Sequence, residues 1–132
     1  MKSILTKMLA GEAACHRILE NKKFAAVLEH RPLRPGHLVV FPKKEVDAVF
    51  DLDDDTLTGL ILFAKRAAQA LKEEGPCRKI ALVAYGLQTP HAHLHLIPVQ
   101  GEAGEIDLSR SRPEAAEKDL AALAARLSRR LA

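Results

Sequence analysis

The chain has 132 residues, 48% of them hydrophobic, which is enough for one domain with a single modest core. Its 20 Lys and Arg against 17 Asp and Glu give a formal charge of +3, and only 4% of its residues are aromatic, so we expect no nucleic-acid partner and a slight preference for small anions. No apolar run approaches the roughly 20 residues of a membrane span and the first residues lack the apolar region of a signal peptide, so we expect no membrane association and a cytoplasmic protein.

The first part of the chain predicts a short helix, three strands and a long helix. The short helix is expected over residues 3–10, and the strands near residues 15–19, 24–29 and 38–41. The acidic stretch 51–55 supplies helix N-cap candidates. Apolar residues then recur at helical spacing from Leu57 to Leu71, and Gly75-Pro76 ends the helix. This helical stripe could form a dimer interface or pack on its own sheet.

The second part predicts two more strands and a final helix. Residues 80–85 form an apolar strand and a histidine-rich strand follows it. Residues 101–112 are expected to be a polar linker, and residues 113–132 a helix that begins with a capping box of Ser111 and Glu114. We therefore predict one α+β domain over residues 1–132, with its core over about residues 3–100 and an antiparallel sheet.

Histidine alternates with apolar residues from His91 to Pro98, which is the period of a β-strand. A strand would place the imidazoles of His91, His93 and His95 on one side and leave Ala92, Leu94 and Ile97 for packing elsewhere. Three rings that titrate near neutral pH could supply a nucleophile for phosphorus with supporting groups, or zinc ligands. A solvated polar strand face is the ordinary alternative, and three convergent titratable groups make it the least favoured.

A second motif lies upstream, where residues 32–36 contain two prolines and a glycine just before His37. These residues fix a loop, and the apolar run after His37 predicts a buried strand. His37 would then stand at the mouth of that strand, where the loop could deliver it to the histidine cleft. A loop-capping hydrogen bond is the simpler alternative for this ring.

Three segments together resemble the histidine triad family of nucleotide hydrolases and transferases. They are Leu-Ala-Gly-Glu at 9–12, Pro-Gly-His-Leu-Val-Val-Phe-Pro-Lys at 35–43, and Gly-Leu-Gln-Thr-Pro-His-Ala-His-Leu-His at 86–95 with Ile-Pro at 97–98. The resemblance covers about residues 3–100. It implies the HIT-like fold, with about five antiparallel strands, a long central helix and a C-terminal helix, and a homodimer.

The resemblance also implies roles for the four histidines. His93 matches the family's nucleophile, which attacks the α-phosphorus of a nucleotide and forms a nucleotidyl-histidine that water resolves. His91 and His95 match the groups that hold the tautomer of the nucleophile and contact phosphate oxygens, and His37 matches a supporting histidine. The nucleophile must present a lone pair, so its other nitrogen needs an acceptor.

The same resemblance implies a nucleoside pocket. Glu29 stands where the family commonly has an Asp that accepts hydrogen bonds from both ribose hydroxyls. Gln88 and Thr89 match polar groups around the phosphate and leaving group. The positions that line the base hold His30, Leu5 and Met8, although core packing explains the last two equally well.

Some members of the family carry a structural zinc site, and its positions here hold Ser3, Thr6 and Glu45. We therefore expect no metal and no cofactor, although a polyphosphate substrate could arrive with its own magnesium. The expected partner is a purine nucleotide or nucleotide conjugate, cleaved as a phosphoramidate, a dinucleoside polyphosphate or another nucleotidyl ester. Two alternatives stay open: a nucleotide-binding regulatory protein with little turnover, and a metal-dependent hydrolase with the three histidines as ligands. Retention of all three imidazoles favours the enzyme.

Overall fold

The structure is a computed structural model that describes residues 2–132. Its three α-helices are α1 (Ile4–Leu9), α2 (Asp54–Glu74) and α3 (Glu117–Leu131), with a short 3-10 turn at Val49–Asp51. Its strands are β1 (Arg17–Glu20), β2 (Phe24–Leu28), β3 (Leu38–Pro42), β4 (Lys79–Val83) and β5 (Leu94–Val99). The predicted order of helices and strands is therefore confirmed.

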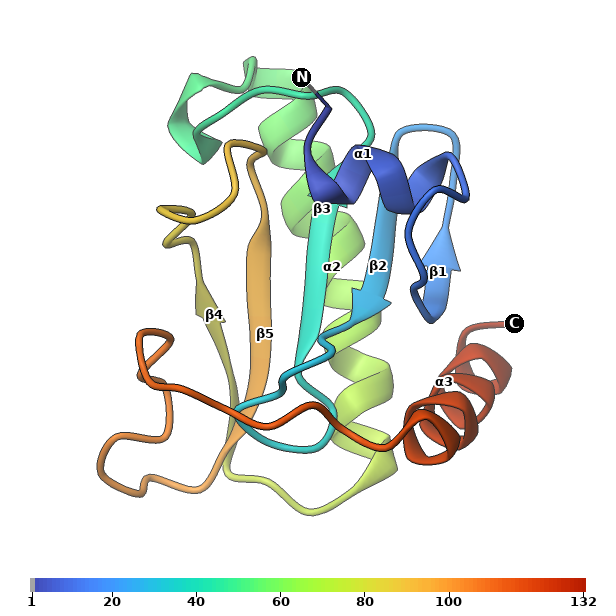
Figure 1. Cartoon of the computed structure of the whole chain (residues 1–132), viewed down its shortest axis with the longest axis vertical. Coiled ribbons are helices and arrows are strands. Elements are labelled where there is room, and N and C mark those ends of the chain that lie inside the picture. Colours follow the sequence, from blue (N-terminus) through green and yellow to red (C-terminus); the bar gives the residue numbers. More distant parts are fainter. Residues whose placement is uncertain (1) are drawn as a thin grey trace.

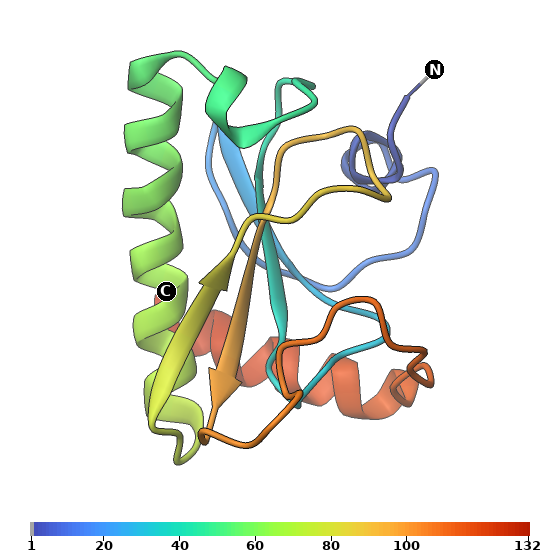
Figure 2. The ribbon, with the colours of Figure 1, turned by 90° about the vertical axis from the view of Figure 1, so that its left-hand side faces the viewer.

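The strands form one antiparallel sheet in the order β1-β2-β3-β5-β4, so the expected α+β fold with five antiparallel strands is confirmed. Figure 1 shows α2 behind this sheet and α1 in front of it. In Figure 2, turned by a right angle, α2 lies on one side of the sheet, while α1 and the irregular segment after β5 lie on the other. The sheet thus has one face covered by the long helix and another that is partly open.

The covered face holds the larger core. Alternate strand residues such as Leu38, Val40 and Leu94 pack there against the apolar side of α2, including Leu60 and Leu71. Asp53 begins the helix because its side chain accepts the backbone N–H of Thr56 at 2.7 Å, which confirms that a residue of the acidic stretch is the N-cap. Most of the predicted apolar stripe therefore packs on its own sheet and is not a free interface; Ile61 is the exception, at 42% exposed.

The opposite face holds a smaller core and the histidines. Its apolar members come from α1, β2 and β3 and are Leu5, Met8, Ala25, Val27, Val39 and Phe41. His95 pairs with Val39 across β3 and β5, and the His91 ring stacks edge-on against Phe41 at 5.5 Å between centroids. The histidines and α1 therefore share one face of the sheet.

Several local predictions are wrong. His91 and His93 precede β5, which begins at Leu94, although the expected alternation of sides persists. Leu96 joins Ala92 and Leu94 in the larger core in place of Ile97, because Ile97 has the same parity as the histidines.

The capping box predicted for the last helix is also wrong. Helix α3 begins at Glu117 after Ala116, whose side chain cannot cap, so Ser111 and Glu114 lie in the irregular segment before it. Within residues 2–132, no helix is both long and apolar enough to cross a bilayer.

Candidate active site

A cavity of about 250 Å³ opens on the face of the sheet that carries α1. Eight of the ten residues proposed from the sequence line it: Leu5, Met8, Glu29, His30, Gln88, Thr89, His93 and His95. They come from α1, from the end of β2, from the loop before β5 and from β5 itself. The structure thus gathers residues that are up to 90 positions apart into one pocket. His37 and His91 do not line this cavity; both rings are fully buried behind it.

His93 is held in one tautomer. Its Nδ1 lies 2.7 Å from the backbone carbonyl oxygen of His91. A carbonyl can only accept, so Nδ1 carries the hydrogen and Nε2 keeps the lone pair in the neutral ring. The ring lines the cavity and is 7% exposed. His93 therefore has the electronic arrangement of a nucleophile.

His37 and His95 form a directed pair. The backbone N–H of Leu33 donates to Nδ1 of His37 at 3.1 Å, so the hydrogen of the His37 ring is on Nε2. That Nε2 lies 2.8 Å from Nδ1 of His95, which must accept, and the hydrogen of His95 is then on its Nε2. His37 thus fixes His95, which lines the cavity, as a donor through Nε2.

Burial keeps this pair neutral. Desolvation, with the neighbouring His95 ring and Arg112, lowers the pKa of His37 from 6.5 to about 3. Desolvation, with the neighbouring His93 ring and Arg112, lowers the pKa of His95 to about 4. Both rings are therefore uncharged at neutral pH. The loop-capping bond considered for His37 exists, and it serves to orient the histidine that reaches the cavity.

His91 is a buried bridge between the start of α1 and the end of β3. Its Nε2 lies 2.7 Å from the carbonyl oxygen of Pro42, to which it donates, and its Nδ1 accepts from the hydroxyl of Ser3 at 2.7 Å. Desolvation lowers its pKa. Because both ring nitrogens are engaged and the ring does not line the cavity, His91 acts on His93 through its own carbonyl.

Glu45 anchors the same cluster from the segment after β3. Its Oε1 accepts from the backbone N–H of Ser3 and from the hydroxyl of Thr6, both at 2.7 Å. These hydrogen bonds lower the pKa of Glu45 to about 2. A hydrogen-bonded cluster of Ser3, Thr6 and Glu45 thus fastens α1 over His91. These are the three positions that hold the structural zinc site in some members of the family.

Glu29 lines the cavity at the end of β2 and faces a cation. Burial raises the pKa of this carboxyl, and the nearby Arg112 guanidinium opposes that rise. Nη2 of Arg112 lies 3.6 Å from Oε1 of Glu29. Two acceptor oxygens in a half-buried pocket suit a vicinal diol.

Arg112 and Leu108 are cavity residues that the sequence analysis missed. Both belong to the segment interpreted as a linker, which contains no helix or strand but crosses the open face of the sheet (Figure 1). No periodicity marks such a segment, so the sequence carries no signal for its contacts.

The remaining predicted residues also line the cavity. Leu5 and Met8 belong both to the smaller core and to the cavity lining, so the two interpretations of these residues are compatible. His30 lines the cavity with its Nε2 3.1 Å from the carbonyl oxygen of Ala14. Gln88 and Thr89 lie on the loop that leads to His91.

No group of three or more His, Cys, Asp or Glu side chains is placed to hold a metal ion among residues 2–132. The arrangement of the histidines gives the physical reason at the triad. Both ring nitrogens of His91 and the Nδ1 atoms of His93 and His95 are engaged in hydrogen bonds, so His91 has no ring nitrogen left for a metal ion.

Comparison with known families identifies the HIT domain, whose sequence model matches residues 10–102. Adenosine 5′-monophosphoramidase HNT1 of Saccharomyces cerevisiae is 30% identical over 101 residues, which are 75% of this chain and 63% of the yeast protein. Bis(5′-nucleosyl)-tetraphosphatase (asymmetrical) of Schizosaccharomyces pombe is 32% identical over 108 residues, 77% of this chain and 59% of that protein. The chain thus spans less than two thirds of both of these relatives.

Solved structures share the fold. A Hit-like protein from Bartonella henselae, described as involved in cell-cycle regulation, superposes with a TM-score of 0.85 at 23% identity, covering 98% of this chain and 96% of that one. A zinc-bound histidine triad family protein from Mycobacterium smegmatis gives a TM-score of 0.77 at 26% identity, with 98% and 95% covered. The similarity extends over nearly the whole of this chain.

Proposed function

Because the chain belongs to the HIT domain family, we propose that it is a nucleotide hydrolase or transferase that acts through a covalent nucleotidyl-histidine at His93. The observation that carries the proposal is the 2.7 Å contact between Nδ1 of His93 and the carbonyl oxygen of His91, inside a pocket that also holds a second oriented histidine. A protein that only bound phosphate would need donors, not a ring that presents a lone pair.

In the proposed first step, Nε2 of His93 attacks the α-phosphorus and a nitrogen–phosphorus bond forms. The bond from phosphorus to the leaving group breaks, and the leaving group keeps the electron pair and takes a proton from solvent. The His93 ring becomes cationic in the adduct, and the His91 carbonyl that accepts from Nδ1 stabilises this charge. His95, which has its hydrogen on Nε2, donates to a phosphoryl oxygen.

In the second step, water attacks phosphorus and the nitrogen–phosphorus bond breaks. The electron pair returns to Nε2 of His93, the water oxygen stays on phosphorus and one proton passes to solvent. The ring is again neutral with its hydrogen on Nδ1, as the structure has it. Hydrolysis is the outcome with water, and transfer is the outcome with another acceptor.

The nucleoside would lie between Glu29, which receives the ribose hydroxyls, and the apolar side chains of Leu5 and Met8, with His30 at the base. Gln88 and Thr89 would face the phosphate and leaving group. The cavity lining supports this arrangement. The activities for which the two yeast relatives are named, a phosphoramidase and a tetraphosphatase, support the class of substrate, a nucleoside monophosphate joined to an amine or to a polyphosphate.

Single-turnover assays over a panel of adenosine and guanosine phosphoramidates and dinucleoside polyphosphates test the proposal. We expect release of the nucleoside monophosphate with at least one class of leaving group, without added cofactor. Tight nucleotide binding with no turnover across the panel would instead support the regulatory alternative.

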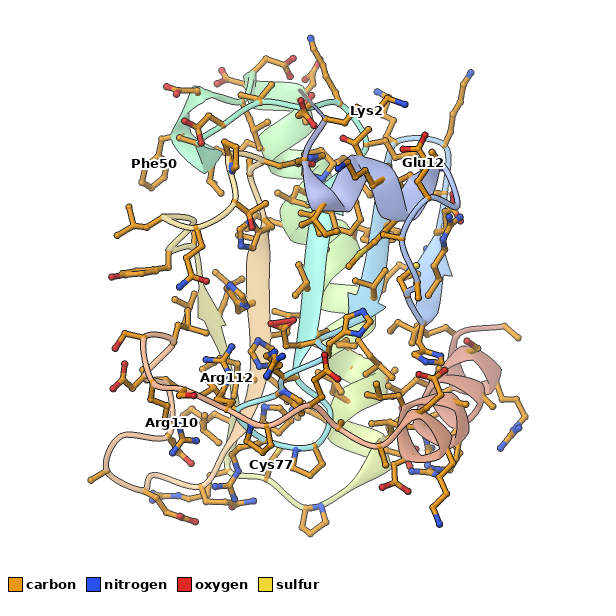
Figure 3. The ribbon with its side chains drawn as sticks, in the orientation of Figure 1. Lys2, Glu12, Phe50, Cys77, Arg110 and Arg112 are labelled. Carbon is orange, nitrogen blue, oxygen red and sulfur yellow. The ribbon has the colours of Figure 1, made fainter. Side chains whose placement is uncertain are left out.

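We also propose a homodimer formed through the edge of the sheet at β4. This strand has one unpaired side, and large apolar residues near it are exposed, including Leu82, Tyr85 and Leu87. Figure 3 labels Phe50, which is 92% exposed, on the same side of the molecule. Light scattering of the wild type and of Leu82→Lys tests this: a dimer that becomes a monomer supports it, and a monomeric wild type contradicts it.

A further inference from the structure

Arg112 gives the cavity a permanently cationic side chain. Among the described residues that line it, Arg112 alone is an Arg or Lys. Its side chain is 13% exposed and faces the 24% exposed side chain of Glu29, the acid proposed to receive the ribose. Arg112 also lies outside the part of the chain that matches the HIT domain model. The family sequence model therefore assigns no role to this residue.

The chain around Arg112 holds the guanidinium in place. Its Nε donates to the carbonyl oxygen of Arg31, and its Nη1 donates to that of Leu108 at 3.0 Å. In return, Nη1 of Arg31 donates to the carbonyl oxygen of Arg112 at 3.0 Å. Two of the three guanidinium nitrogens, Nε and Nη1, are thus committed, and Nη2 is left to face Glu29.

Further contacts fasten the same segment beside Glu29. The backbone N–H of Ala115 donates to the carbonyl oxygen of His30 at 2.8 Å, and Nη2 of Arg110 lies 3.5 Å from that of Leu33. Figure 3 shows Arg110 and Arg112 labelled on the stretch that crosses in front of the sheet. The segment is therefore docked along the residues that directly follow Glu29.

We propose that Arg112 is a specificity-determining residue, which orients the Glu29 carboxylate so that it receives the 2′- and 3′-hydroxyls of a ribonucleoside. The inference rests on the proposed function, because it assumes that the nucleoside occupies this cavity. It adds to that function a discrimination between ribose and 2′-deoxyribose that depends on Arg112, a residue outside the match to the HIT domain sequence model.

The physical reason lies in the chemistry of an acid in a partly buried pocket. A carboxylate accepts from two hydroxyls at once only if it is ionised and its plane is fixed. Burial favours the protonated form of Glu29, and Arg112 opposes it. A guanidinium anchored by two carbonyls has a fixed direction, which a lysine ammonium could not reproduce.

Adenosine is the informative probe, because it carries the ribose without the phosphate. Affinities of the wild type and Arg112→Met for adenosine, 2′-deoxyadenosine and AMP are measured by calorimetry. We expect the wild type to prefer adenosine over 2′-deoxyadenosine by about tenfold, and Arg112→Met to lose this preference by weakening adenosine alone. The affinity of Arg112→Met for AMP should fall by the same factor as its affinity for adenosine. Arg110→Met is the matched control: it removes the 3.5 Å contact of the same segment with the carbonyl oxygen of Leu33, but Arg110 does not line the cavity, so this variant should keep the preference.

The pH dependence of adenosine affinity distinguishes this role from a purely structural one, which would leave it unchanged. Without Arg112, the Glu29 carboxyl protonates at a higher pH, so adenosine affinity should fall earlier in Arg112→Met than in the wild type as pH is lowered. If Arg112→Met does not fold, the same affinities are measured for Arg112→Lys. The lysine cannot hold both carbonyls and face Glu29, so its preference for adenosine should be smaller than that of the wild type.

Four results would overturn the inference. The first is an unchanged preference for ribose in the folded Arg112 variant. The second is a loss of the ribose preference in Arg110→Met that equals the loss in Arg112→Met. The third is a loss for AMP that spares adenosine, which would assign Arg112 to the phosphate. A wild type that binds adenosine and 2′-deoxyadenosine equally well is the fourth. The proposed function survives all four, whereas a wild type that neither binds nor cleaves nucleotides ends both proposals.

Discussion

The Nδ1 atom of His93 lies 2.7 Å from the backbone carbonyl oxygen of His91, two residues earlier in the chain. The position of that carbonyl depends on His91, whose own ring is clamped between Ser3 and Pro42. Ser3 is the N-cap of α1, since its side chain accepts the backbone N–H of Thr6, so hydrogen bonds connect the start of α1 through His91 to the proposed nucleophile. The first helix is part of the active-site support, although its only contacts with the cavity are apolar.

Ser3→Ala tests this support. The substitution leaves the buried Nδ1 of His91 without a donor, which should lower the free energy of unfolding by about 1 to 3 kcal/mol. It should also reduce kcat with little change in KM, because the nucleophile is misplaced while the nucleoside pocket is intact. Urea unfolding and steady-state kinetics measure both effects. Thr58→Ala is the control, since its hydroxyl bonds only to the carbonyl of Asp54 in its own helix. Wild-type kcat in Ser3→Ala would contradict the account.

The buried neutral pair of His37 and His95 predicts an acid-sensitive fold. Their pKa values of about 3 and about 4 lie below the usual 6.5, so between these values the unfolded chain binds more protons than the folded one. Stability should therefore fall as pH drops below about 6.5, by up to about 1.4 kcal/mol per pH unit for each ring. Thermal unfolding of the wild type and His37→Asn between neutral and acidic pH measures this. The variant should show a shallower dependence, and an identical slope would show that His37 does not contribute.

Glu29→Gln tests the ribose contact itself. The amide keeps one acceptor but loses the charge and the second acceptor, so AMP should bind more weakly by about 1 to 3 kcal/mol. Removal of the 2′-hydroxyl from the ligand should cost a similar amount in the wild type. The two losses should not add, because each removes the same contact. Calorimetry measures the affinities of both proteins for AMP and 2′-deoxy-AMP. If the two losses of binding free energy add, Glu29 is not the acceptor of the ribose hydroxyls.

Dialysis against a chelator tests the expectation that the histidines need no metal. Both nitrogens of His91 are engaged by Ser3 and Pro42, so this ring cannot ligate without breaking the support of His93. Cleavage of a phosphoramidate should be unchanged after dialysis, and metal analysis should find no stoichiometric zinc. Activity that is lost on dialysis and restored by zinc would favour the metal-dependent hydrolase instead.

The alternation of side chains made much of this structure predictable. It identified the common side of His91, His93 and His95, because a period of two is a local property of the backbone. The strand near Leu38 was predicted instead from the continuous apolar run after His37. Helix α2 was equally clear from its spacing and its acidic start. Family resemblance then supplied roles for residues that no local pattern could assign, such as Glu29.

The remainder depends on contacts distant in sequence. That His91 is turned away from the cavity follows from Ser3, 88 residues earlier, and from the carbonyl of Pro42. Arg112 reaches Glu29 only because an irregular segment is fastened across the sheet. Neither arrangement has a sequence period, so both required the structure.

The central claim is most directly tested by trapping the intermediate. A phosphoramidate is mixed with the wild type, the reaction is quenched within one turnover under conditions that preserve phosphohistidine, and the peptide that contains residues 91–95 is examined by mass spectrometry. We predict a mass increase of one nucleoside monophosphate, located on His93. The folded His93→Ala variant should bind AMP yet lose the adduct and several orders of magnitude in turnover. An adduct on His91 or His95, or near-normal turnover by His93→Ala, would contradict the mechanism.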